Sequence, residues 1–405
     1  MKTVFVLVDA LKSLYLNEEN MPFLYGFANE NFHINKIVPS PGFCERCEVF
    51  SGLGCFDTGN FTAIGYDSER GYYKNSSIII KIASAMAKVK PRFGRALLKK
   101  YRDYKKIPLK PYRIPFKSLK NYVLTEDGEH QYIKYKTIFD VMSCNNMKYT
   151  LDGFTSLSDI GKPSINNYID FLKENLKNGM EFIPIYFGKI DTVGHKYGND
   201  VDKIKPHLQE VNNLLWRLFE VANEYDARFC VLGDHGMVPI ENRINMTSIL
   251  EKNGLLNENH YEMFLDSTIA RFWFDDSKNI KIFKSFFENE LSDYGYCITE
   301  DNFELLRVPM DIKGLDGYNV YGQLIWAARP GTLISPDYFH DLLPTINGMH
   351  GYIDVDSENG VGLFCSNHKK EKSLEKHLYE VTDFLCESLE IETPNKIGWS
   401  RIKND

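Results

Sequence analysis

The stretch Arg228-Phe-Cys-Val-Leu-Gly-Asp-His-Gly-Met237 decides how the rest of the chain is interpreted. Its first half is an apolar run of strand length that ends at a glycine. Asp234 and His235 follow at the carboxyl end, which is where ligands bind in open α/β sheets. One carboxylate oxygen and one imidazole nitrogen suit Zn²⁺ or Mn²⁺. An Asp-His pair is also common in turns and helix caps, so its meaning depends on partners elsewhere in the chain.

Strand-like and helix-like segments alternate along much of the sequence. Buried strands are expected at 4–8, 37–38, 149–151, 182–187 and 361–364. Helices are expected at 43–53, 165–176, 202–225 and, at the end of the chain, 373–389. Such alternation is typical of a doubly wound α/β fold with a mostly parallel sheet.

Composition and pattern together predict a core with two additions. The metal-binding α/β core is expected to comprise residues 1–65, 136–254 and 336–405. Residues 255–335 contain strands near 268–274 and 320–328 and a helix near 278–291, which predicts a smaller α+β subdomain. Residues 66–135 differ from both parts and are interpreted as a basic insertion.

The insertion carries much of the positive charge of the chain. Residues 88–120 contain thirteen Lys or Arg and a single acid, Asp103, although the whole chain has a net charge of −7. One amphipathic helix is predicted at 88–104. The segment could be a solvated insertion, a lid over an anionic substrate, or a contact for anionic lipid or a membrane surface through 88–120. Nucleic acid is not expected, because no recognised binding module accompanies the patch.

The overall composition is that of a globular protein, with 43% hydrophobic and 25% charged residues. Eight cysteines in 405 residues do not form a disulfide framework and indicate reduced thiols. The apolar run 1–8 is too short for a signal peptide, and no run of 18 apolar residues is present. We therefore expect a cytoplasmic location.

Four further metal-type residues lie at strand tips or beside glycine. Asp9 follows the 4–8 strand, and His350 lies in a Gly-Met-His-Gly segment. Asp191 and His195 are four residues apart, so one helical turn would place both side chains on one face. With the Asp-His pair they make three Asp and three His. Six such ligands suit two divalent ions that keep open positions for a substrate.

This set resembles the alkaline phosphatase superfamily, and most of all its nucleotide pyrophosphatase/phosphodiesterase branch. The resemblance spans about 1–65 and 140–365. The matching motifs, in the family's order, are Val8-Asp9, Asp191-Thr-Val-Gly-His-Lys-Tyr-Gly198, Gly233-Asp-His-Gly-Met237 and Met349-His-Gly-Tyr352.

The resemblance implies an alkaline phosphatase-like fold and a site for two Zn²⁺ ions, with Mn²⁺ as the alternative. One ion would be held by Asp191, His195 and His350. The other would be held by Asp9, Asp234 and His235. The anionic substrate would be a phosphoester whose phosphoryl group lies between the ions.

The sequence departs from the family pattern at the attacking group. Counting back from Ser51-Gly52, the position of the family's Thr, Ser or Cys nucleophile is occupied by Gly42. Ser40 and Cys44 are the candidate replacements, and direct attack by water or an acceptor hydroxyl is the third alternative. The family's phosphate-binding Asn aligns with Glu45, whose charge would repel a phosphate unless the carboxylate is protonated or bound to a metal. Arg46 is a candidate phosphate clamp.

We therefore expect a metal-dependent phosphodiesterase, phosphohydrolase or phosphotransferase acting on a phosphodiester or nucleotide-type substrate. Two alternatives remain at this stage. The chain could be a non-catalytic metal-binding member that lacks the nucleophile, or a sulfatase-type esterase on the same scaffold.

Overall fold

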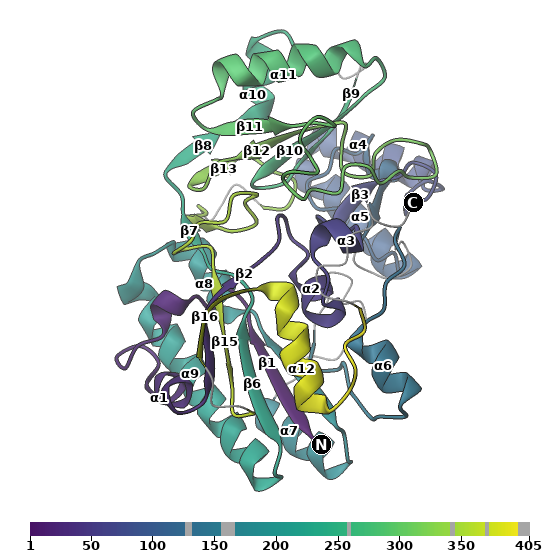
Figure 1. Cartoon of the computed structure of the whole chain (residues 1–405). Helices are drawn as coiled ribbons and strands as arrows, with labels where there is room; N and C mark the ends of the chain where they lie inside the picture. Colours follow the sequence, from purple (N-terminus) through teal and green to yellow (C-terminus); the bar gives the residue numbers. More distant parts are fainter. Residues whose placement is uncertain (126–131, 155–166, 257–260, 341–344, 369–371, 396–405) are drawn as a thin grey trace.

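The computed structural model describes residues 1–125, 132–154, 167–256, 261–340, 345–368 and 372–395. Two sheets organise these residues (Figure 1). The six-stranded sheet carries the chain's N-terminal strand at its interior, and a four-stranded sheet lies beyond one end of it.

The larger sheet has the order β16-β2-β15-β6-β1-β5. The β1/β5, β1/β6 and β16/β2 pairs are parallel, whereas β15 runs antiparallel to both of its neighbours. The mostly parallel α/β fold predicted from the sequence is confirmed. The strand bounds are β1 Thr3–Val8, β2 Phe32–Val38, β5 Phe182–Phe187, β6 Arg228–Gly233, β15 Gly362–Ser366 and β16 Lys372–His377.

Helices cover both faces of this sheet (Figure 1). Alternate residues of β1 point to opposite faces, as strand geometry requires, so Val4 and Val6 belong to one core cluster and Phe5 to another. The first cluster contains side chains of α1 Pro22–Glu30, α7 Tyr168–Lys177, α8 Lys189–Tyr197 and α9 Val201–Glu224. The second contains side chains of α2 Glu45–Ser51, α6 Ile138–Cys144 and α12 Val381–Leu389.

The smaller sheet is antiparallel, in the order β11-β12-β10-β9. Phe272 and Trp326 on one face pack with Phe283 and Phe287 of α11. The bounds of this part are β9 Tyr261–Leu265, β10 Ile269–Phe274, β11 Gly295–Ile298, β12 Leu324–Ala328, α10 Met246–Lys252 and α11 Lys278–Glu290. Short pairs join the two parts of the chain: β7 Val238–Pro239 with β14 Gly348–Met349, and β8 Asn242–Ile244 with β13 Thr332–Ile334.

The basic segment lies between two paired strands, β3 Ile64–Tyr66 and β4 Tyr122–Leu124. Its core includes Phe264 and Trp273 of the smaller sheet, so the segment packs against that sheet. The helix predicted at 88–104 is confirmed from residue 91 onward as α5, but it is wrong at its first three residues, which belong to a preceding helix and the break after it. The structure has α4 Ser77–Val89 and α5 Pro91–Lys105, because Lys90 is extended and Pro91 begins a new helix, where its missing N–H is tolerated.

Two other element predictions are wrong. The strand predicted at 149–151 is only an isolated bridge from Tyr149 to Phe182, because the chain turns at Asp152-Gly153. The terminal helix predicted at 373–389 begins only at Val381. Its first part is the edge strand β16, where Leu374 is exposed and does not contribute to an apolar helix face.

The remaining short elements are α3 Cys55–Thr58 and the 3₁₀ turns η1 Ser13–Tyr15, η2 Leu119–Asn121 and η3 Leu378–Glu380. Within the described ranges, no helix has both the length and the apolar character needed to cross a bilayer.

Candidate functional site

Polar residues gather in one cavity at the carboxyl ends of β1, β5 and β6. Asp9 follows β1, Asp234 and His235 follow β6, and α8 begins directly after β5. Because β1 pairs in parallel with both β5 and β6, these three strand ends lie side by side. The cavity wall includes residues from both sheets: Asp9, Phe43, Glu45, Arg46, Ala63, His195, Asp234, His235, Asp266, Ser267, Phe339, His340, Met349 and His350.

Asp9, Asp234 and His235 form the first group. Each offers one ligand atom, and these atoms all lie within 4.8 Å of one another. The Asp9 Oδ1 atom is 2.9 Å from His235 Nε2, and the Tyr186 hydroxyl donates a hydrogen bond to the other Asp9 oxygen. The backbone N–H of Ala10 donates to Asp234 Oδ1 at 3.2 Å, which holds the two strand tips together.

The environment shifts the pKa values of this group strongly. Burial by itself raises the pKa of Asp9, but the close approach and charge of His235, with the hydrogen bond from Tyr186, outweigh burial and lower the net pKa. Burial raises the pKa of Asp234 to about 8, against the opposing charge of His235. Burial acts to lower the pKa of His235, but the charges of Asp234 and Asp9 raise it well above its ordinary value.

Asp191, His195 and His350 form the second group, again with ligand atoms within 4.8 Å of one another. Asp191 and His195 lie one turn apart on α8, as predicted from their spacing, with Asp191 Oδ1 3.1 Å from His195 Nε2. His350 follows β14, and its Nε2 lies 3.6 Å from the same oxygen. His195 Nδ1 pairs with the carbonyl of Gly348 at 2.9 Å, so β14 also orients the first imidazole.

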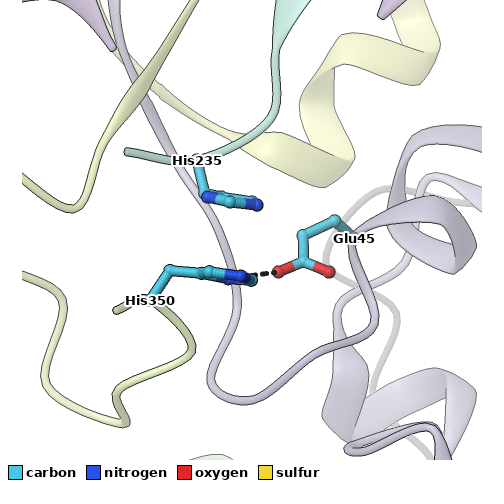
Figure 2. Close-up of side chains that lie close together, drawn as sticks. All are labelled: Glu45, His235 and His350. Carbon is cyan, nitrogen blue, oxygen red and sulfur yellow. Dashed lines mark ion pairs between the residues drawn. The ribbon is translucent and has the colours of Figure 1, made fainter. Parts of the chain in front are cut away.

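The two groups meet at a histidine pair (Figure 2). The rings of His235 and His350 are stacked, with centroids 3.8 Å apart and an interplanar angle of 9°. Glu45, at the start of α2, faces both rings, and its Oε1 lies 3.9 Å from His350 Nδ1. Burial and the neighbouring charges of His235 and His195 lower the pKa of His350 well below its ordinary value.

Glu45, which the sequence places at the position of the family's phosphate-binding Asn, is a further functional candidate. Glu45, His235 and His350 form a third group whose ligand atoms lie within 4.8 Å of one another. Burial raises the pKa of Glu45, partly opposed by the charge of His235. No sequence signal places Glu45 beside the histidines, because Glu45 is 190 positions from His235 and 305 from His350 in the chain.

The turn between β2 and α2 explains the glycine at the expected nucleophile position. Gly42 has a φ of +93°, and a Cβ built there would lie 2.0 Å from the carbonyl oxygen of Phe61. The same carbonyl accepts the backbone N–H of Phe43 at 2.8 Å, so the approach is part of the turn. A Thr, Ser or Cys at this position would therefore displace the backbone.

Ser40 and Cys44, the two candidate replacement nucleophiles, are not among the described residues that line the main cavity. Ser40 lines a smaller adjoining cavity, its Oγ accepts the backbone N–H of Cys55 at 3.3 Å, and its own N–H donates to Glu48. Cys44 is buried, with 1% of its surface exposed. Arg46, in contrast, lines the main cavity, with its guanidinium 5.1 Å from the ring of Tyr186.

A second polar cluster, of which His340 and Ser267 line the same cavity, was not predicted from the sequence. His340 Nδ1 lies 2.9 Å from Asp337 Oδ2 and 3.3 Å from Ser267 Oγ, and the backbone N–H of His340 donates to Asp337 at 2.7 Å. The ring of His340 is 5.7 Å from that of His195. The Asp-x-x-His spacing directly after Ser335-Pro336 was the one available signal.

The sequence profile of the type I phosphodiesterase / nucleotide pyrophosphatase family matches residues 111–353, which is more than half of the chain. The chain belongs to this family. The resemblance inferred from the four motifs is thus confirmed, and with it the expectation of a phosphoric ester hydrolase that acts on phosphodiesters. Membership in the type I phosphodiesterase family also implies dependence on divalent metal ions.

Solved structures show the same fold. Murine ectonucleotide pyrophosphatase/phosphodiesterase 5 is 13% identical with a TM-score of 0.68, over 100% of this chain and 99% of that one. The human protein is 12% identical with a TM-score of 0.69, over 98% and 97%. An inactive variant of the murine protein, in complex with AMP, is 13% identical with a TM-score of 0.66, over 97% and 96%. No curated protein matches the chain by sequence.

Proposed function

We propose that this type I phosphodiesterase hydrolyses a phosphodiester of nucleotide type at a site that holds two divalent cations. The observation that carries the proposal is the meeting of two Asp/His groups in one cavity. The complex of the murine relative with AMP supports a nucleotide-type substrate. The surplus of Lys and Arg in residues 88–120 is consistent with an anionic partner.

Buried atoms without hydrogen bonds support the presence of cations. Asp9 Oδ1, Asp191 Oδ1 and His350 Nδ1 are buried and make no hydrogen bond among the described residues. Each of these three atoms lies within ion-pair distance of an imidazole nitrogen or a carboxylate oxygen. None of these contacts has hydrogen-bond geometry. Leaving such atoms unsatisfied is costly, and a bound cation would satisfy them.

We assign Asp191, His195 and His350 to one cation and Asp9, Asp234 and His235 to the other. The mixed oxygen and nitrogen donors favour Zn²⁺, with Mn²⁺ as the alternative. His235 Nδ1 lies 2.8 Å from the carbonyl of Gly236, and His195 Nδ1 has the Gly348 carbonyl, so both rings leave Nε2 for a cation. When bound, the two ions would stabilise the attacking and leaving oxygens of an in-line displacement.

The geometry favours direct attack by water or an acceptor hydroxyl. Gly42 offers no side chain, and Ser40 and Cys44 lie off the main cavity wall. Glu45 faces the histidine pair, and burial raises its pKa, which makes its carboxylate a stronger base for the proton of the attacking oxygen (Figure 2). Arg46 would bind a phosphoryl oxygen from the cavity wall.

The test combines metal content with turnover. We expect about two Zn²⁺ or Mn²⁺ per chain, and faster hydrolysis of bis-p-nitrophenyl phosphate than of the corresponding monoester or sulfate ester. Asp234→Ala should abolish turnover and Glu45→Gln should reduce it by about 10²–10⁴-fold as expected for loss of a general base. Ser40→Ala and Cys44→Ala, as matched controls, should retain activity.

Each alternative gives a distinct result. Loss of activity in one of the two control variants, with metal content intact, would identify that residue as the nucleophile. Two bound ions without any turnover would favour the non-catalytic member, and preference for the sulfate ester would favour a sulfatase-type esterase. One ion or none would contradict the proposed site. A cytoplasmic location belongs to the same proposal and is supported by the modest cysteine content, eight residues in 405, which is not that of a disulfide-rich framework.

A further inference from the structure

The helices α4 and α5 form a hairpin with an exposed apolar stripe. Ile78, Ile82, Met86 and Val89 are spaced by three or four residues, which places them on one side of α4. Their exposed fractions are 76%, 47%, 37% and 84%, and Phe93 at the start of α5 is 45% exposed. A soluble helix normally turns such a stripe toward the core.

The stripe is not the core-facing side of the hairpin. Ile80 and Ala83 on the other side of α4 are buried and belong to one cluster with Leu98 of α5. A Cβ on Gly94 would lie 2.2 Å from the carbonyl oxygen of Ala83, so α5 approaches α4 closely at this glycine. The hairpin therefore has a packed inner side, and the stripe remains outside it.

The exposed stripe is accompanied by a high positive charge. Residues 77–106 contain ten Lys or Arg and one acid, Asp103. Lys90 Nζ and the Arg92 guanidinium lie 5.6 and 5.7 Å from the centroid of the exposed Phe93 ring. The exposed basic residues of the hairpin are Lys81, Lys88, Lys90, Arg92, Lys99, Lys100, Lys105 and Lys106.

We propose that the hairpin docks on the surface of an anionic phospholipid bilayer. The stripe would lie at the boundary of head groups and acyl chains, and the lysines and arginines would contact the head groups. An aliphatic stripe is unsuited to nucleic acid, which is bound through stacking on aromatic rings and through phosphate contacts. The combination of apolar side chains with high positive charge fits a bilayer whose apolar layer lies under anionic groups.

Co-sedimentation with vesicles tests this proposal. The full chain should bind vesicles that contain about 30 mol% phosphatidylglycerol in phosphatidylcholine, and should bind pure phosphatidylcholine much more weakly. Binding should weaken as salt concentration rises, because part of the attraction is electrostatic.

Two sets of variants separate the apolar and charged contributions. The triple variant Ile78→Ser, Ile82→Ser, Val89→Ser keeps every charge and should bind at least about tenfold more weakly. Lys88→Gln, Lys90→Gln, Arg92→Gln keeps the stripe and should lose most of the preference for anionic vesicles. Ile282→Ser on α11, a site 52% exposed, is the matched control and should bind like the parent.

The outcomes are independent of the proposed catalytic site, because vesicle binding is measured without substrate and requires no turnover. Equal thermal unfolding of all variants shows that exposed substitutions leave the fold intact. The proposal is overturned if anionic vesicles are not bound, if the triple variant binds as tightly as the parent, or if an oligonucleotide of equal charge concentration displaces the chain while the apolar substitutions have no effect.

Discussion

At the scale of single residues, the site is defined by how burial and charge act on a few side chains. Asp9 and Asp234 lie on adjacent strand tips, yet the pKa of the first is lowered and that of the second is raised. The difference follows from contact, because His235 lies 2.9 Å from Asp9 Oδ1 but 3.9 Å from Asp234 Oδ1. Of these two carboxyls, Asp234 is therefore the one whose ionisation costs the metal-free protein more.

Metal-free protein should lose stability as the pH rises through the pKa of Asp234. A folded-state pKa of about 8 means that the folded chain holds this proton more tightly than the unfolded chain does. The resulting loss grows above the ordinary aspartate value and is complete above about pH 8. Asp234→Asn removes this loss, so chelator-treated variant should unfold at a higher temperature than chelator-treated parent at about pH 9.

The measurement is thermal unfolding of both proteins from about pH 6 to about pH 9, with and without Zn²⁺. Zn²⁺ should stabilise the parent more at high pH, because a bound cation requires the ionised carboxylate. An unchanged difference between the two metal-free proteins across this range would show that Asp234 does not titrate there.

At the scale of elements, the backbone geometry of the turn between β2 and α2 excludes a Thr, Ser or Cys at the position where the family has its nucleophile. Gly42 combines a positive φ with a close approach to Phe61, and both features belong to the path from the strand to the helix. The same segment places Glu45 and Arg46 on the cavity wall. Introducing a hydroxyl-bearing side chain at position 42 would therefore disturb the side chains that line the cavity.

Gly42→Ser should destabilise the chain and should not increase turnover. The positive φ costs a side chain about 1–3 kcal/mol, and the contact with the Phe61 carbonyl adds to it. Gly317→Ser is the matched control, since its φ is +82° and a Cβ there would meet no atom within 4 Å. Chemical denaturation should give a larger loss for Gly42→Ser, and equal losses would mean that the turn adapts to the side chain.

At the scale of the whole molecule, one buried arginine connects the parts that surround the cavity. Arg271 of β10 is completely buried, and its Nε donates to Asp266 at 2.8 Å. Its Nη1 donates to the carbonyl of Ile64 in β3 at 2.7 Å. Asp266 itself lines the cavity, so this ion pair joins the basic segment, the smaller sheet and the site.

Arg271→Met should cost about 3–5 kcal/mol of unfolding free energy, because it leaves a buried carboxylate without its cation. Lys284→Met removes the exposed pair with Asp301 and should cost at most about 1 kcal/mol. Denaturant unfolding with a constant slope would measure both. Similar costs for the two variants would contradict the structural role given to Arg271.

Much of the framework follows from local sequence patterns. The apolar runs of β1, β5 and β6 and the polar residues at their ends are visible in the sequence, because strand burial and strand termination are encoded within a few residues. The spacing of Asp191 and His195 likewise predicted one helix face, and the structure confirms it. The four motifs are sufficient to indicate the family from the sequence alone.

Other features depended on contacts between distant segments. The edge strand β16 exists because residues 372–377 pair with β2, and local periodicity alone suggested a helix there. Glu45 lies beside the histidine pair, and His340 lines the same cavity, because elements far apart in the chain pack together. Which side of α4 is exposed depends on how its other side packs against α5, and no local pattern gives this packing.

The sequence by itself therefore determined the strands, their polar tips and the metal-type residues, because those properties depend on neighbours along the chain. Only the tertiary structure decided which tips converge, that Gly42 cannot carry a nucleophile, and which helix faces stay exposed. These depend on sheet order and close packing, which bring together atoms that no local pattern relates.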